Sequence, residues 1–84
     1  MVIKIIKVPE GPEPEWVRKE WIGMWLAAQD RPDQDGIFID GKQILTTLKQ
    51  KSPKAAEYYF SVANEEEWNL FCFGPLAEDE YREV

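Results

Sequence analysis

The sequence contains no histidine and a single cysteine among its 84 residues. Histidine is the commonest general base at neutral pH, so the usual means of acid–base catalysis is absent. Cys72 cannot form a disulfide within the chain, which is typical of proteins from a reducing compartment. It also has no histidine partner that could activate it as a nucleophile. These absences argue against an enzyme, and we predict no catalytic residue.

Signals for membranes, cofactors and metals are also missing. No stretch approaches the roughly 20 apolar residues of a membrane span. The start, MVIKIIKV, carries lysines within its apolar run and no small-residue cleavage site, so it does not read as a signal peptide. No phosphate loop, dinucleotide fingerprint or zinc spacing occurs. We therefore expect a cytoplasmic protein with no cofactor and no membrane partner.

A fragment of a calcium loop occurs at Asp33-x-Asp35-Gly36. With Gly36 at the sixth loop position, Arg31 and Lys42 occupy the first and twelfth positions. Those two positions most need carboxylates. The fragment therefore predicts a polar turn, and we expect no metal site.

The net charge of −6 is unevenly distributed. Residues 1–64 carry nine basic and nine acidic side chains, whereas residues 65–84 carry one basic and seven acidic. An acidic chain repels a phosphate backbone, so direct nucleic-acid binding is disfavoured. Residues 79–84 read either as a loose acidic tail or as part of a short return strand.

Three of the four tryptophans lie between Trp16 and Ala28. Residues 21–27 alternate as a strand with apolar side chains on both faces, which predicts a central strand covered twice. Gly23 leaves a gap between Trp21 and Trp25 on one face. That gap is filled by a helix or loop, or it is a ligand groove walled by the two tryptophans.

The remaining elements follow from periodicity and capping signals. Asp40 with Gln43 is a capping-box pattern that predicts a helix over residues 41–51, and Ser52-Pro53 predicts a second helix ending near residues 62–64. Trp25 and Leu70 are expected in the core. The predicted strands cover residues 2–8 (an edge strand, because of its two lysines), 21–27, 37–39 and 68–73. Three prolines predict an irregular or polyproline-like connector over residues 9–15.

Together these elements predict one α+β domain over residues 1–84. Short connections favour antiparallel neighbours. We therefore expect a small twisted antiparallel sheet, with an SH3-like half-barrel as one form of it and the helix pair inserted before the last strands. We favour a monomer in which the sheet curls on itself and Trp16 plugs its end.

One resemblance adds to this interpretation. Trp21-Ile22-Gly23-Met24, followed by Ser52-Pro53-Lys54-Ala55-Ala56-Glu57-Tyr58-Tyr59, resembles a group of short uncharacterised bacterial proteins. They pair a Trp-x-Gly strand with a Ser-Pro-x-x-Ala-Ala helix and an aromatic pair. The resemblance implies the fold and carries no activity or ligand.

The missing catalytic signals and the many aromatic residues favour a non-catalytic protein-binding or regulatory module of unknown target. Two alternatives remain open: a small-ligand binder using the Trp21 and Trp25 face, and an acidic inhibitor that imitates nucleic acid. The candidate partner-binding residues are Trp16, Trp21, Trp25 and Tyr58. Tyr58 is included because three consecutive aromatic residues of a helix cannot all be buried. The expected partner is another protein.

Overall fold

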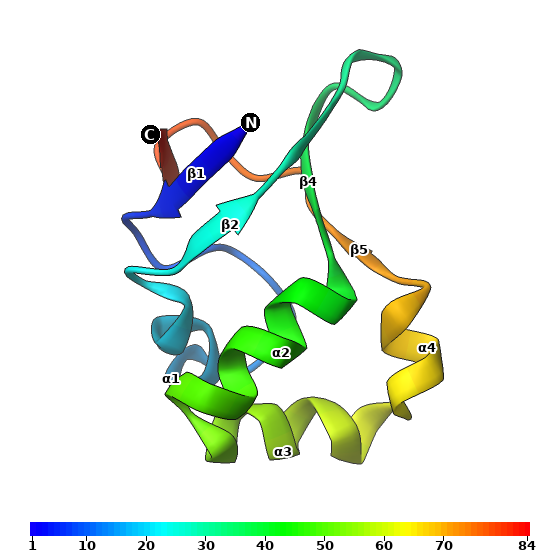
Figure 1. Ribbon diagram of the computed structural model, residues 1–84. Coiled ribbons are helices and arrows are strands. Elements are labelled where there is room, and N and C mark those ends of the chain that lie inside the picture. Colours follow the sequence, from blue (N-terminus) through cyan, green and yellow to red (C-terminus); the bar gives the residue numbers. More distant parts are fainter.

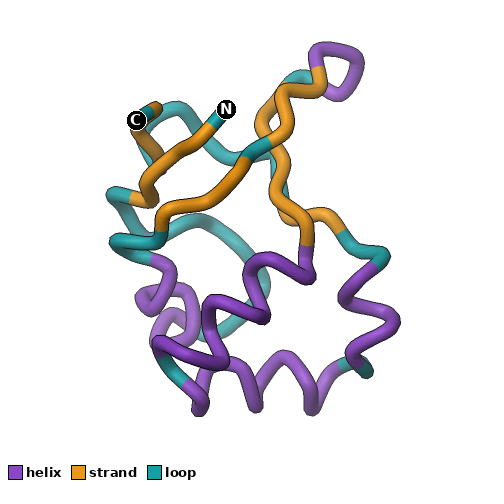
Figure 2. The backbone as a smooth tube through the Cα atoms, viewed as in Figure 1, coloured by secondary structure: helices purple, strands orange, loops and turns teal.

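Strands gather at one end of the molecule and the α-helices at the other, while one short 3-10 turn caps the strand end (Figure 1, Figure 2). The computed structural model describes all of residues 1–84. This arrangement confirms the predicted α+β class with helices inserted before the last strands. In chain order the elements are β1 (Val2–Ile5), α1 (Glu15–Arg18), η1 (Lys19–Trp21), β2 (Trp25–Ala27), β3 (Gln29–Arg31), η2 (Pro32–Gln34), β4 (Gly36–Asp40), α2 (Gly41–Lys51), α3 (Pro53–Val62), α4 (Glu65–Asn69), β5 (Cys72–Phe73) and β6 (Tyr81–Glu83).

The strands form two antiparallel sheets rather than the single sheet we expected. Their orders are β2-β1-β6 and β3-β4-β5. Ala28 alone separates β2 from β3, so one run of chain serves both sheets. The prediction of an edge strand at residues 2–8 is wrong, because β1 is shorter and lies between two neighbours. A lysine in this strand does not require an edge position, because buried and outward-facing side chains alternate along it. Ile3 and Ile5 are buried while Lys4 lies on the outer face of the sheet.

The core lies between the inner faces of the sheets and the helix pair α2–α3. The predicted bounds of α2 are confirmed, and α3 ends within the predicted range. Their apolar stripes meet the buried strand residues in one cluster. The fully buried members include Ile3, Ile5, Leu26, Ile39, Ile44, Leu48, Ala55 and Tyr59.

The predicted strand over residues 21–27 is wrong in its first half. Trp21 ends a 3-10 turn, and Gly23 has a φ of +89°, a conformation that glycine adopts without strain. Gly23 N donates to Ile5 O at 2.8 Å, so the turn closes against β1. Trp21 is buried, whereas Trp25, on the outer face of β2, is 61% exposed. The core prediction for Trp25 is therefore also wrong.

The predicted strand over residues 68–73 begins as a helix. Asn64 accepts a hydrogen bond from Glu67 N, and the Glu67 carboxylate accepts one from Asn64 N, which completes a capping box. The three glutamates of the first turn suit the positive end of the helix dipole. Leu70 follows the helix and is 89% exposed, so its predicted place in the core is wrong.

The capping box predicted at Asp40 is absent. Asp40 makes no cap hydrogen bond, and its Oδ1 accepts from Gln29 Nε2 at 3.1 Å. The Gln43 amide instead pairs with the backbone of Ala27, accepting from its N at 2.7 Å and donating to its O at 2.8 Å. The polar residues at the start of α2 therefore tie the helix to the strands.

The acidic end is part of the fold. Tyr81–Glu83 pairs with β1, and Val84 N donates to Val2 O at 2.9 Å. Residues 79–84 are therefore a return strand with its preceding turn, and the alternative of a loose tail is wrong. The termini consequently lie side by side (Figure 1).

Candidate functional site

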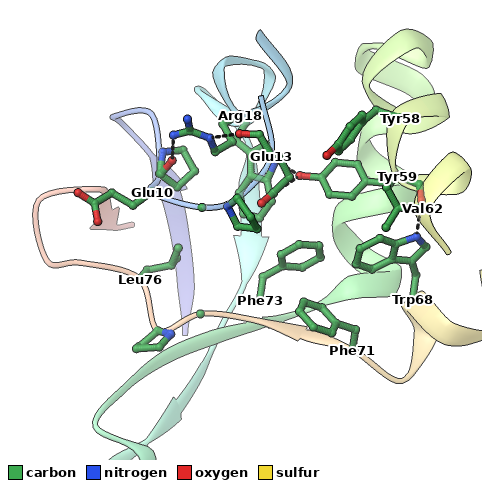
Figure 3. A pocket seen from close by; sticks show the side chains of 16 residues that line it. Glu10, Glu13, Arg18, Tyr58, Tyr59, Val62, Trp68, Phe71, Phe73 and Leu76 are labelled. Atoms are coloured by element: carbon green, nitrogen blue, oxygen red, sulfur yellow. Dashed lines mark hydrogen bonds between the residues drawn. The ribbon is translucent and has the colours of Figure 1, made fainter. Parts of the chain in front are cut away.

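A cavity of about 440 Å³ opens between the connector that follows β1, helix α3 and the segment from α4 through β5 (Figure 3). We call it the aromatic pocket. A cavity of a few hundred Å³ is the size in which proteins commonly bind small molecules or side chains. Its lining residues are Pro9, Glu10, Gly11, Pro12, Glu13, Arg18, Trp21, Tyr58, Tyr59, Val62, Trp68, Phe71, Phe73, Gly74, Pro75 and Leu76.

One wall consists of packed aromatic rings. Trp68 and Phe73 stack with their planes 10° apart and their centroids at 5.6 Å. Phe71 meets Phe73 edge-on at 4.9 Å. Tyr59 meets Trp68 and Phe73 edge-on at 5.2 and 5.7 Å. These are the offset and T-shaped arrangements that aromatic pairs prefer. They form because α4 ends at Asn69 and the chain turns back as β5, which brings residues 68, 71 and 73 together.

The opposite wall is the proline-rich connector, residues 9–13, which has no regular secondary structure. Side chains fix it at three points. Arg18 Nη1 donates to Pro9 O and its Nε to Glu13 O, both at 2.8 Å. Glu10 N donates to Glu80 Oε2 at 2.9 Å, and the other Glu80 oxygen accepts from Ala77 N at 2.9 Å. The buried Glu80 carboxylate thus clamps the connector to the C-terminal turn.

The two walls meet at a chain of hydrogen bonds. Trp21 Nε1 donates to Tyr59 Oη at 3.2 Å, and Tyr59 Oη donates to Glu13 Oε2 at 2.5 Å. Burial of the phenol, together with its hydrogen bond to the Glu13 carboxylate, raises the pKa of Tyr59 well above its ordinary value. Tyr59 therefore stays neutral and donates a hydrogen bond to Glu13 throughout the physiological range.

The rim of the pocket is apolar and open to solvent. Val62 on α3 is 62% exposed, and Phe71 on the other side is about half exposed. Tyr58 continues the apolar surface outward, because its ring meets Trp16 edge-on at 6.4 Å. The exposed aromatic surface therefore extends beyond the cavity itself.

The predicted partner-binding residues separate into two groups. Trp21 and Tyr58 line the pocket, and Trp16 contacts Tyr58. Trp16 is 51% exposed while its neighbour Val17 is buried, so Trp16 does not plug the sheet as we predicted. Trp25 lies elsewhere, opposite Lys4 in the β1–β2 pair. Trp21 and Trp25 therefore share no strand face, which excludes the alternative of a ligand groove walled by these two residues.

The sequence interpretation missed most of the lining. Glu13 and Arg18 lie in and beside a connector that we read as irregular, and Trp68, Phe71 and Phe73 were assigned to one strand. The Asn64-x-x-Glu67 pattern is a capping-box signal that would have placed Trp68 on a helix. Nothing local to residues 9–13 indicates that distant side chains hold this connector.

Cys72, the single cysteine, is not a lining residue. Its Sγ lies 3.5 Å from Asp40 Oδ1 and accepts a hydrogen bond from Arg31 Nη2 at 3.4 Å. The chemistry that the pocket itself offers is ring faces, one phenol–carboxylate pair and a fixed guanidinium. These side chains can bind a small molecule or a side chain of another protein and fix its orientation.

Two properties of the whole chain complete the description. No helix of the structure is both long and apolar enough to span a membrane. Comparison of the chain with protein-family models, with curated proteins and with solved structures finds no match.

Proposed function

We propose that this chain is a non-catalytic protein-binding module, and that the aromatic pocket accepts one side chain from a segment of a partner protein. The observation that carries the proposal is a preformed aromatic cavity with an exposed apolar rim. A pocket whose walls are already fixed loses little conformational entropy when it binds. Aromatic residues in such pockets commonly dominate the binding energy of protein interfaces.

The extent of the apolar surface favours a protein partner. Val62 and Phe71 at the rim, with the Tyr58–Trp16 pair beyond them, extend the apolar surface outside the cavity, where a small molecule bound within it does not reach. Exposed apolar patches on a monomer often mark sites that bind other proteins. This apolar rim suits a segment of a partner protein that lies across the opening and inserts one side chain into the pocket.

A small-ligand binder is the second candidate, because the cavity volume falls within the ordinary range for ligand sites. It would use the aromatic pocket and not the face of Trp25. The third alternative, an acidic inhibitor that imitates nucleic acid, stays a prediction, and the cavity does not support it. Glu80 is buried and Asp79 pairs with Lys7 at 2.7 Å, which leaves fewer free carboxylates at the acidic end.

Selection of short random peptides against the immobilised protein tests the proposal. Selected peptides should bind the wild type and the Trp25→Ala variant equally, because Trp25 is exposed on the distant sheet face. They should lose binding to Phe71→Ala and to Val62→Trp, which respectively removes a rim wall and places a ring across the opening. Circular dichroism confirms that each variant is folded. Failure to enrich any peptide, or loss of binding in Trp25→Ala alone, would contradict the proposal.

Sedimentation at low micromolar concentration tests the related proposal that the chain acts as a monomer. We expect the monomer mass for the wild type. A dimer that dissociates in Phe71→Ala would instead identify a second copy of the chain as the occupant of the rim.

A further inference from the structure

The aromatic pocket offers few hydrogen-bond donors to a ligand. Both indole N–H groups are already engaged: Trp21 Nε1 donates to Tyr59 Oη, and Trp68 Nε1 donates to Tyr59 O at 2.8 Å. The Tyr59 hydroxyl hydrogen is directed to Glu13. The Tyr58 hydroxyl is the one aromatic donor of the lining that stays free. Otherwise the wall offers the π-systems of its rings, whose faces carry negative partial charge and attract cations.

The acceptor side of the pocket is open. Glu13 Oε2 is occupied by Tyr59, whereas its Oε1 accepts no hydrogen bond. A Cβ atom on Gly11, another lining residue, would lie 2.7 Å from that Oε1, so this oxygen lies along the pocket wall. Glu10 is also a lining residue, and Figure 3 shows its carboxylate directed away from the aromatic wall.

One cation already lines the pocket, but it is held by the connector. Both Arg18 hydrogen bonds go to carbonyl oxygens of residues 9 and 13. Figure 3 shows Arg18 beside the connector, with Trp68 and Phe71 on the other side of the cavity. The guanidinium is therefore already engaged, whereas Glu13 keeps one free carboxylate oxygen in a chain whose net charge is −6. The free oxygen and the negative charge of the chain both attract a positively charged ligand.

We propose that the pocket binds an alkylammonium group, namely the side chain of a lysine, methylated or not, in the partner segment. The apolar stem lies along Val62 and Phe71, and the charged end lies among the ring faces near Glu13 Oε1. A single free oxygen suits a compact ammonium, whereas a guanidinium binds carboxylates best through two oxygens. This inference rests on the proposed protein-binding function and adds the chemistry of the inserted residue.

A pair of probes with one shape and different charge tests the inference. Choline carries a quaternary ammonium, and 3,3-dimethylbutan-1-ol is its uncharged carbon counterpart. Both are titrated against the protein, and the NMR signal of the Trp68 indole N–H reports occupancy of the pocket. We expect choline to bind at least about tenfold more tightly, because cation–π contacts and a carboxylate act only on the charged probe.

Glu13→Gln keeps an acceptor for Tyr59 and removes the negative charge. It should weaken choline binding about tenfold and leave binding of the alcohol unchanged, since only the charged probe interacts with the carboxylate. Glu66→Gln, at an exposed carboxylate of α4 outside the pocket, is the matched control and should change neither. Equal affinity of the wild type for the two probes would overturn the cation inference and leave the protein-binding proposal to the peptide selection.

Two short peptides that differ only in acetylation of one lysine distinguish the sources of the ammonium group. The peptide with free lysine should shift the Trp68 signal, and the acetylated peptide should not. Choline binding without binding of either peptide would overturn the assignment of the cation to a protein side chain. Selected peptides that bind the pocket but lack any basic residue would overturn the cation inference alone.

Discussion

The Tyr59→Phe substitution tests the hydrogen-bond chain that joins the two walls of the pocket. It removes one hydroxyl group and keeps the ring, so the aromatic packing against Trp68 and Phe73 is preserved. The buried Trp21 Nε1 loses its acceptor, and Glu13 Oε2 loses its donor. Tyr59 is only 1% exposed, so water cannot replace the lost partner without a rearrangement.

The magnitude follows from these two losses. A buried donor left without a partner costs about 1–3 kcal/mol, and a hydrogen bond to a charged group contributes roughly 1.5–3 kcal/mol. Partial hydration of Glu13 offsets some of the second loss, so we expect the free energy of unfolding to fall by about 2–4 kcal/mol. That is a large fraction of the roughly 5–15 kcal/mol that stabilises an ordinary domain.

Urea denaturation followed by far-ultraviolet circular dichroism measures this change. The adjacent Tyr58→Phe is the matched control, because Tyr58 Oη makes no hydrogen bond and its ring is only half-buried. We expect that control to change stability by less than about 0.5 kcal/mol. Equal stability of the two variants would refute the assignment of Tyr59 as the polar link between the walls.

Three further predictions concern the titration of Tyr59, the start of helix α2 and the two tryptophans at positions 21 and 25. Because the pKa of Tyr59 is raised above its ordinary value of 10.0 in the folded state, its contribution is fully present below that pH and declines above it. The free energy of unfolding of the wild type should therefore fall by up to about 1.4 kcal/mol for each pH unit above that value. The Tyr59→Phe variant should not show this decline. Gly41→Ala should destabilise by about 1–3 kcal/mol, although alanine is the better helix former, because its Cβ would lie 2.3 Å from Trp68 O. Thermal denaturation checks this against Lys42→Ala, which alters an exposed neighbour on the same helix turn. Trp21→Ala should cost about 3–5 kcal/mol and Trp25→Ala less than about 1 kcal/mol, as measured by denaturant unfolding; the reverse order would contradict the described turn.

Local signals predicted the helix pair well and the tryptophan segment poorly. Helices α2 and α3 carry an apolar stripe, a proline at the start of the second and two lysines at the end of the first. In the tryptophan segment, residues 16–28, the buried residues are Val17, Trp21, Met24, Leu26 and Ala28. Their spacing is four, three and then two, because helical turns lead into a strand. An interpretation with a single period of two assigns Trp21 and Trp25 to one face, although one is buried and the other exposed.

The pocket could not be predicted from local patterns, because its walls are joined by contacts distant in sequence. Glu13 and Tyr59 are 46 residues apart, and Glu10 and Glu80 are 70 apart. The composition of residues 9–15 predicted an irregular connector, and the structure agrees that it has no strand or long helix. The composition of the connector does not reveal which distant side chains hold it in place, and these are those of Arg18, Tyr59 and Glu80.

Two acidic residues of the chain have a structural role in the pocket. Glu80 clamps the connector, and Glu13 joins the connector to the aromatic wall, so two carboxylates that look like surface charge shape the cavity. Glu13 also supplies the free oxygen on which the proposed ammonium site depends. Glu13 therefore contributes to both the shape and the charge of the pocket. A loss of ligand binding in Glu13→Gln can be assigned to charge only if the variant keeps the Tyr59 hydrogen bond. Stability close to that of the wild type, and well above that of Tyr59→Phe, is the evidence for this.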